Sequence, residues 1–202
     1  MTDHPLLPGR LADPGLADTG QSWPVNATDT KYASPYISLS IDTIVDPQGE
    51  EHGRAVVRPN GAVGVLALDV DDRLLLVEQY RHPVGRRMLE IPAGTLDVEG
   101  EPALDAAIRE LAEEADLLAA EWEPMLSLFA TPGYSTEHWQ VFRASGLSAV
   151  PAADRTTRVA EEADMSQWWM PFDEAVDSVL AGRFTDSMTV SAILAAQVLR
   201  SR

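Results

Sequence analysis

The sequence contains no cysteine, which excludes a disulfide framework and a thiolate metal site. No apolar run reaches the roughly 18–20 residues that a membrane-spanning helix needs. Basic residues are scarce, with 15 Lys and Arg against 32 Asp and Glu, for a formal charge of −17. We see no basic patch that would override this charge, and no secretory signal at the N-terminus. We therefore expect a cytoplasmic protein that binds neither nucleic acid nor membrane.

The 202 residues, 45% of them hydrophobic, suit one domain with a sizeable core and an appendage. Residues 1–35 are rich in Pro, Gly, Asp and Thr and have little periodicity. They predict an N-terminal arm that is partly disordered or docked on a partner subunit. Residues 36–61 predict an N-terminal strand region, and residues 62–202 the main domain.

Strands outnumber helices in this main domain. Alternating or continuous apolar runs bounded by turn residues predict strands at residues 36–45, 53–58, 62–68, 73–78, 88–91, 122–129, 138–144 and 164–170. Helices are predicted after Pro102 and at residues 173–180 and 186–199. Residues 79–87 predict a polar loop, and residues 147–163 a long polar connection. This arrangement predicts an α+β fold.

Residues 94–117, GTLDVEGEPALDAAIRELAEEADL, combine a glycine loop with an acidic helix. Pro102 suits the first turn of that helix, where the missing N–H is harmless. The helical spacing of four apolar residues predicts one buried stripe. They are Leu104, Ile108, Leu111 and Ala115.

Glu110 and Glu114 lie four residues apart, so they stack on one flank of the helix. Such a pair of like charges costs roughly 0.2–0.5 kcal/mol in an isolated helix. A bound divalent cation would offset the repulsion, and a site with only oxygen ligands favours Mg²⁺ or Mn²⁺. Arg109 can pair with Glu113 as a brace, leaving the other two acids for metal. The alternative is a solvated acidic face with ordinary ion pairs.

The same stretch resembles the Nudix box, Gx5Ex7REUxEExGU, where U is an aliphatic residue. The matching residues are Gly94, Glu101, Arg109, Glu110, Leu111, Glu113, Glu114 and Leu117. The sequence departs from the box at two points. Six residues, not five, separate Gly94 from Glu101, and Asp116 stands in place of the second glycine. The extra residue falls in the loop before the helix, so the helical spacing of the acids is kept. Asp tolerates the left-handed conformation that a helix-ending glycine adopts.

Further segments resemble the ADP-ribose pyrophosphatases within this family. They are QYR at residues 79–81, EIPAG at residues 90–94 and an acidic loop at residues 161–165. Pro132 follows Leu117 by fifteen residues, about the spacing of the proline that marks ADP-ribose hydrolysis in the family. The resemblance implies a Nudix-type α/β/α sandwich with a mixed sheet, preceded by an N-terminal antiparallel strand region.

The resemblance also assigns roles to individual residues. Metal ligands would be the Ala93 carbonyl and the side chains of Glu110, Glu113, Glu114 and Glu162. Glu113 could instead serve only as the partner of Arg109. Catalysis would use Glu114, with Glu162 or Glu161 as general base. Substrate contacts would come from Arg81, Arg54, Pro132 and Glu137. Trp168 and Trp169 are expected in the core, with stacking on a base as the alternative.

These roles imply Mg²⁺-dependent hydrolysis of ADP-ribose to AMP and ribose 5-phosphate by a homodimer. One alternative is hydrolysis of another nucleotide sugar or a dinucleotide. A second alternative is a non-catalytic Nudix domain that senses a nucleotide. In each case the partner is a small nucleoside diphosphate.

Overall fold

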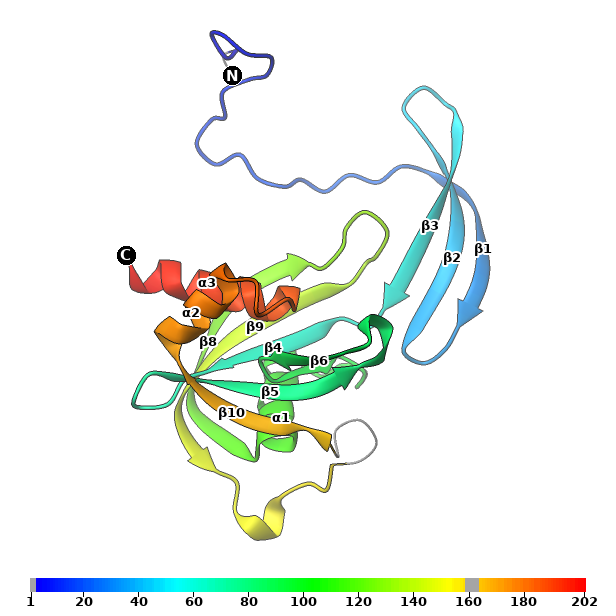
Figure 1. The fold of residues 1–202 in the computed structure, drawn as a ribbon. Helices are drawn as coiled ribbons and strands as arrows, with labels where there is room; N and C mark the ends of the chain where they lie inside the picture. The colour runs from blue at the N-terminus through cyan, green and yellow to red at the C-terminus, as the bar shows by residue number, and fades with distance from the viewer. Residues whose placement is uncertain (1–2, 159–163) are drawn as a thin grey trace.

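A computed structural model describes residues 3–158 and 164–202. Its first sheet is an antiparallel meander in the order β1-β2-β3, which stands apart from the rest of the chain in Figure 1. The three strands are β1 (Val25–Ala33), β2 (Ile37–Val45) and β3 (Glu51–Pro59). The predicted strands in residues 36–61 are confirmed. Strand β1 is an addition, and it escapes prediction because its residues are all exposed and form no apolar face.

The remaining strands form two sheets in the body of the molecule. One is mixed, in the order β7-β4-β9-β8, with β4 parallel to β9, and the other is antiparallel, in the order β10-β5-β6. Their strands are β4 (Ala62–Ala67), β5 (Arg73–Arg81), β6 (Arg86–Glu90), β7 (Ala93–Thr95), β8 (Leu117–Phe129), β9 (His138–Ala149) and β10 (Ser166–Pro171). The mixed sheet agrees with the predicted fold.

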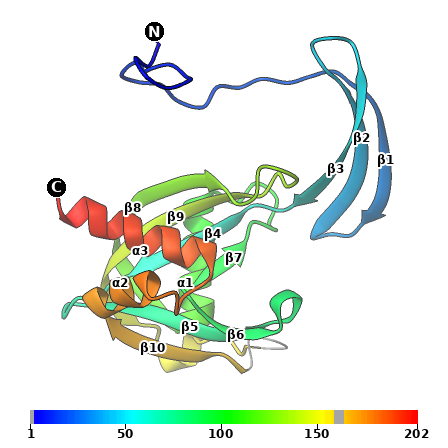
Figure 2. The same ribbon diagram turned by 45° about the horizontal axis from the view of Figure 1, so that its top comes forward.

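Helices cover these sheets from opposite sides (Figure 2). They are α1 (Ala103–Ala115), α2 (Phe172–Leu180) and α3 (Ser187–Arg200). One core cluster packs beneath α1, around Leu111 and Phe142, and a second packs beneath α2 and α3, around Phe172 and Ile193. The α+β sandwich is therefore confirmed. Within the described ranges no helix is long and apolar enough to cross a membrane.

The predicted loop at residues 79–87 is wrong. Residues 79–81 continue β5, a short 3₁₀ helix follows (η1, His82–Val84), and β6 begins at Arg86. The register pairs Tyr80 with Arg87 and Arg81 with Arg86, so backbone pairing carries the hairpin through a polar sequence. The connection predicted at residues 147–163 is also shorter than expected, because β9 continues to Ala149 and a second 3₁₀ helix follows (η2, Ala152–Asp154).

Two burial predictions are also wrong. On α1, Leu104 and Ile108 are 37% and 38% exposed, and the helix instead buries its small residues beside Leu111 together with Glu110 and Glu114. The helix is thus rotated toward β7, because its alanines allow close approach to the sheet. Trp168 and Trp169 on β10 are likewise outside the core, being 52% and 40% exposed.

Candidate active site

Gly94 and Glu110 are in direct contact. A Cβ atom at Gly94 would lie 1.9 Å from the carboxyl carbon of Glu110, closer than any real contact. Glycine is therefore needed here because any side chain would collide with the buried carboxylate of Glu110, and not because the backbone has a positive φ. This contact fixes Glu110, on α1, against β7.

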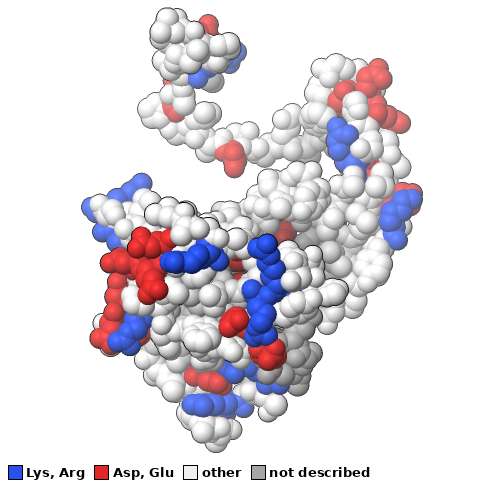
Figure 3. Space-filling view, in the orientation of Figure 1, with Lys and Arg blue, Asp and Glu red and all other residues white. Residues whose placement is uncertain are grey.

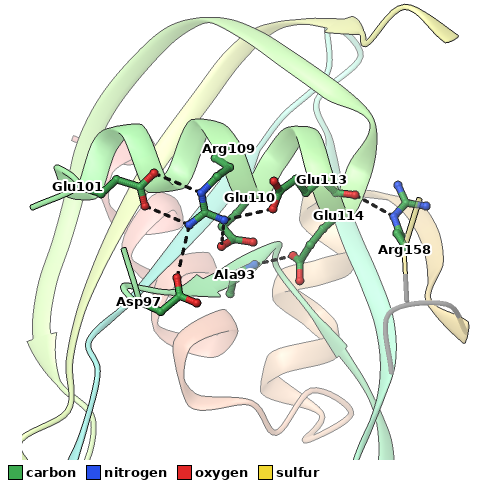
Figure 4. Close-up of polar contacts among 8 residues, drawn as sticks. All are labelled: Ala93, Asp97, Glu101, Arg109, Glu110, Glu113, Glu114 and Arg158. Carbon is green, nitrogen blue, oxygen red and sulfur yellow. Dashed lines mark hydrogen bonds and ion pairs between the residues drawn. The ribbon is translucent and has the colours of Figure 1, made fainter. Parts of the chain in front are cut away.

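Glu114 is held one turn further along α1. Its Oε2 accepts a hydrogen bond of 2.9 Å from the backbone N–H of Ala93, and the residue is only 5% exposed. Glu110 and Glu114 thus both project from α1 toward Ala93 at the start of β7, as Figure 4 shows. The predicted stacking of these two acids is present, and both acids contact the first two residues of β7.

Arg109 binds more acids than the sequence predicts. It pairs with Glu113 at 3.1 Å, as expected, but also with Glu110 at 2.7 Å. Its Nε and Nη2 donate to Glu101 at 3.2 and 3.1 Å, because the loop before α1 returns that residue to the helix (Figure 4). The hydrogen bonds that Arg109 donates to Glu101, followed by the charge of Glu110, outweigh burial and raise the pKa of Arg109. The expectation that Glu110 would be left out of this brace is therefore wrong.

Asp116 ends α1 in the position of the second glycine of the box. Its φ and ψ of 55° and 35° are left-handed, and its N–H bonds to the carbonyls of Leu111 and Ala112. Its carboxylate accepts a hydrogen bond of 2.7 Å from Arg158, which also donates to the Glu113 carbonyl at 2.9 Å. The aspartate thus keeps the backbone shape expected of glycine and adds a contact to a distant segment.

A cavity of about 580 Å³ opens beside β7 and is lined by its residues Ala93 and Gly94. It brings together three predicted site residues, Arg81, Ala93 and Glu137. It also includes Asp186 and Ser187 at the start of α3, which no sequence pattern had marked as site residues. Asp186 caps that helix by accepting the N–H of Thr189 at 2.8 Å.

Other predicted site residues are not among those that line the cavity, and these include the predicted metal ligands Glu110, Glu113 and Glu114. Arg54 lies on β3, in the N-terminal sheet, opposite Asp42. Pro132 is in a loop that backbone hydrogen bonds join to Val57 of β3, through Tyr134 at 2.8 Å and Thr136 at 3.0 Å. Glu161 and Glu162 lie outside the described residues. The roles given to these residues remain predictions.

Arg81 is held by a buried carboxylate. Its Nε and Nη2 donate to Glu90 at 3.1 and 2.6 Å, and Gln79 approaches the same carboxylate at 3.4 Å. Burial lowers the pKa of Arg81, but the hydrogen bonds and charge of Glu90 outweigh it and raise the pKa. Glu90 is 5% exposed, and its position just before β7 was the only sequence signal for its role.

The donor atoms around Ala93 fit a hard divalent cation. Glu110 and Glu114 supply carboxylates and Ala93 can supply its carbonyl, which is an all-oxygen set. In the described part of the chain, no three His, Cys, Asp or Glu side chains gather closely enough to form a site on their own. A cation here would therefore need the backbone oxygen, water or substrate oxygens beside the two glutamates.

Known proteins with this pattern share both sequence and fold with the chain. The family profile described as "NUDIX domain" matches residues 58–188. The chain belongs to the Nudix family. A Mycobacterium tuberculosis Nudix relative, "ADP-ribose pyrophosphatase", is 39% identical over 84% of this chain and 80% of its own length. "Methanol dehydrogenase activator" from Bacillus methanolicus is 31% identical over 82% of this chain and 88% of its own.

A solved structure supports the Nudix fold independently. The "ADP compounds hydrolase" matches with a TM-score of 0.74, covering 91% of this chain and 96% of that one at 21% identity. The chain is thus a Nudix hydrolase, an enzyme that acts on phosphorus anhydrides, and it resembles ADP-ribose pyrophosphatases.

Proposed function

We propose that the protein hydrolyses the diphosphate bond of ADP-ribose to AMP and ribose 5-phosphate, using Mg²⁺. The observation that carries this proposal is the contact of Glu110 with Gly94 and of Glu114 with Ala93, because Ala93 and Gly94 line a cavity together with Arg81. The relative in M. tuberculosis that bears the name ADP-ribose pyrophosphatase supports the choice of substrate.

Each side chain has a defined task in this reaction. Glu110 and Glu114, with the carbonyl of Ala93, would hold the cation, and Glu113 is a further ligand in the proposal. Bound there, Mg²⁺ would withdraw charge from the diphosphate oxygens and lower the pKa of a nearby water. Arg81 donates to diphosphate oxygens from the position that Glu90 gives it. Arg54, Pro132 and Glu137 complete the proposed substrate contacts.

The chemical step adds water across the P–O–P bond. A water oxygen attacks one phosphorus, the bridging oxygen leaves with the other phosphate, and Glu162 or Glu161 accepts the proton. Glu114 contributes to the step by holding the cation. The two products are phosphate monoesters, AMP and ribose 5-phosphate.

A substrate screen tests this proposal. Purified protein is incubated with ADP-ribose, other nucleotide sugars and dinucleotides, after treatment with EDTA and addition of Mg²⁺, Mn²⁺ or Ca²⁺. We expect the highest kcat/KM for ADP-ribose with Mg²⁺, and AMP as one product. A higher kcat/KM for a dinucleotide or another nucleotide sugar would show that this compound, and not ADP-ribose, is the substrate. Activity in EDTA would contradict the metal site.

A matched pair of variants tests the site itself. Glu114→Gln should abolish hydrolysis with the fold retained, because it removes a ligand charge but keeps the shape. Glu123→Gln is the control, since Glu123 is an exposed residue on β8 whose ion-pair partner among the described residues is Arg143, at 3.6 Å. Nucleotide binding without hydrolysis in the wild type would instead identify a sensing domain.

We further propose a homodimer in the cytoplasm. The register places Leu39 opposite Val57, and Ile41 opposite Ala55, on one face of the N-terminal sheet. A three-stranded sheet needs an apolar face packed against something to be stable. A second copy of the chain is the proposed cover, and the mass in solution together with cell fractionation tests both parts.

A further inference from the structure

A second cavity, of about 210 Å³, lies between β6 and the turn that joins α2 to α3. Three arginines line it: Arg86 and Arg87 from β6, and Arg183 from the turn. Figure 3 shows this face, with blue side chains over β6 and a second blue group toward α2 and α3. Among the described residues that line the cavity, Glu78 is the single acidic one.

The charges in this cavity are not balanced. Arg87 is engaged by Glu78 at 3.1 Å and by Asp164 at 2.5 Å. Arg86 and Arg183 form no ion pair with a described carboxylate, and Arg183 donates instead to the hydroxyl of Ser178 at 2.8 Å. With 32 acidic residues against 15 basic ones in the chain, two such arginines in one cavity stand out. The cavity is therefore locally positive on a strongly acidic protein.

This second cavity adjoins the candidate active site. Met88 and Thr185 line both cavities, so the two cavities are neighbours between β6 and the start of α3. The two cavities differ in charge. In the active-site cavity Arg81 is already bound by Glu90, whereas in the second cavity Arg86 and Arg183 keep their charge available.

We infer that this second cavity binds a phosphate-class dianion. Its source is either free phosphate or a phosphomonoester on the part of the substrate that is remote from the nucleoside. Arginine suits this ligand because its planar guanidinium donates two parallel hydrogen bonds to phosphate oxygens. The side chains are exposed, so the binding is weak and depends on salt. The link to the substrate rests on the proposed function, but the anion site itself does not.

Titration of the metal-free protein with inorganic phosphate at low salt tests the site directly. We expect saturable binding with a Kd of about 1 mM by calorimetry. Arg86→Ala and Arg183→Ala should each weaken it by about tenfold, or about 1.4 kcal/mol. Arg183→Lys should restore part of the loss. Arg155→Ala is the control, because Arg155 lies outside the cavity and, within residues 3–158 and 164–202, its side chain donates to the carbonyl of Val150 alone, at 3.2 Å.

Three outcomes would overturn the inference. They are absence of saturable binding, binding that survives the double variant Arg86→Ala/Arg183→Ala, and binding lost only in Arg81→Ala. The last result would place the phosphate in the active site instead. Melting curves of each variant exclude misfolding as the cause of lost binding.

A kinetic comparison then identifies the source of the dianion. ADP-ribose is compared with a derivative that carries a phosphomonoester on its distal ribose. A higher kcat/KM for the derivative, lost in the double variant, assigns the site to the substrate. Equal kcat/KM values, with phosphate binding intact, assign it to free phosphate. If neither compound is hydrolysed the proposed function fails, while the phosphate titration still decides the anion site.

Discussion

The acidic helix and the N-terminal sheet satisfy their polar groups in different ways. On α1, Glu110 and Glu114 are buried, and each is held by a contact with β7 at Ala93 or Gly94. In the N-terminal sheet, β1 is exposed along its whole length, and the buried acid, Asp42, is held inside the sheet by Ser40 at 2.9 Å and by Arg58. The first region depends on long-range packing, whereas the second depends on neighbouring strands.

This difference predicts where substitutions will matter. Where α1 meets β7 at Gly94 there is no space for one added carbon atom, so a substitution there should lower activity and stability together. In the N-terminal sheet a substitution should act locally and leave the body intact.

Gly94→Ala should have the largest effect. The new methyl group displaces Glu110, so hydrolysis should be lost and the free energy of unfolding should fall by about 1–3 kcal/mol. Assays of product formation and urea denaturation measure the two effects. Gly20→Ala is the control, since no atom lies within 4 Å of its added Cβ. Full activity in Gly94→Ala would show that Glu110 does not need its observed position.

Arg109→Ala should have the next largest effect. It removes charged hydrogen bonds to Glu101, Glu110 and Glu113, so we expect a loss of about 1–3 kcal/mol in unfolding free energy. The comparison is Arg73→Ala, whose exposed pairs should contribute about 0–1 kcal/mol. Equal losses in the two variants would contradict the brace.

Asp42 should give the N-terminal sheet an acid sensitivity of its own. Burial raises its pKa, but hydrogen bonds from Ser40 and Arg58 outweigh this, and the pKa falls below 3.8. Because the pKa is lower in the folded state, the ionised carboxylate stabilises the sheet at pH values above the pKa of the unfolded state. This stabilisation is lost as the pH falls through the pKa of the folded state. NMR titration of the Asp42 carboxyl measures the shift. Asp42→Asn should remove this pH dependence, and a titration at or above 3.8 would contradict it.

Removal of residues 1–22 should have the smallest effect. The backbone contacts seen for residues 3–22, such as the bridge between Asp3 and Arg10, are within the segment itself. The free energy of unfolding of the body should change by less than about 0.5 kcal/mol. A clear loss of stability or a change in mass would show that the arm docks on the body or on a second copy.

The sequence predicted the helix α1, its acids and most strands, because these depend on local spacing. It missed the burial of α1, where alanines rather than Leu104 and Ile108 meet the sheet. It left the role of Glu90 undecided and missed Asp186, because a carboxylate that precedes a strand or a helix has no local feature that tells a pocket from solvent. It predicted both strands of the hairpin but missed their extension through residues 79–87, because backbone pairing, not hydrophobicity, defines that part.

The sequence by itself determined the family, through the spacing of Gly94, Arg109, Glu110 and Glu114, since that spacing fixes which residues share a helix face. Only the tertiary structure decided what these residues touch. In the folded chain Glu110 contacts Gly94, Glu114 accepts a hydrogen bond from the N–H of Ala93, and Arg109 donates hydrogen bonds to Glu101. The tertiary structure also gathered Arg86 and Arg183 from separate parts of the chain. Such contacts depend on how sheets and helices pack, which local spacing does not specify.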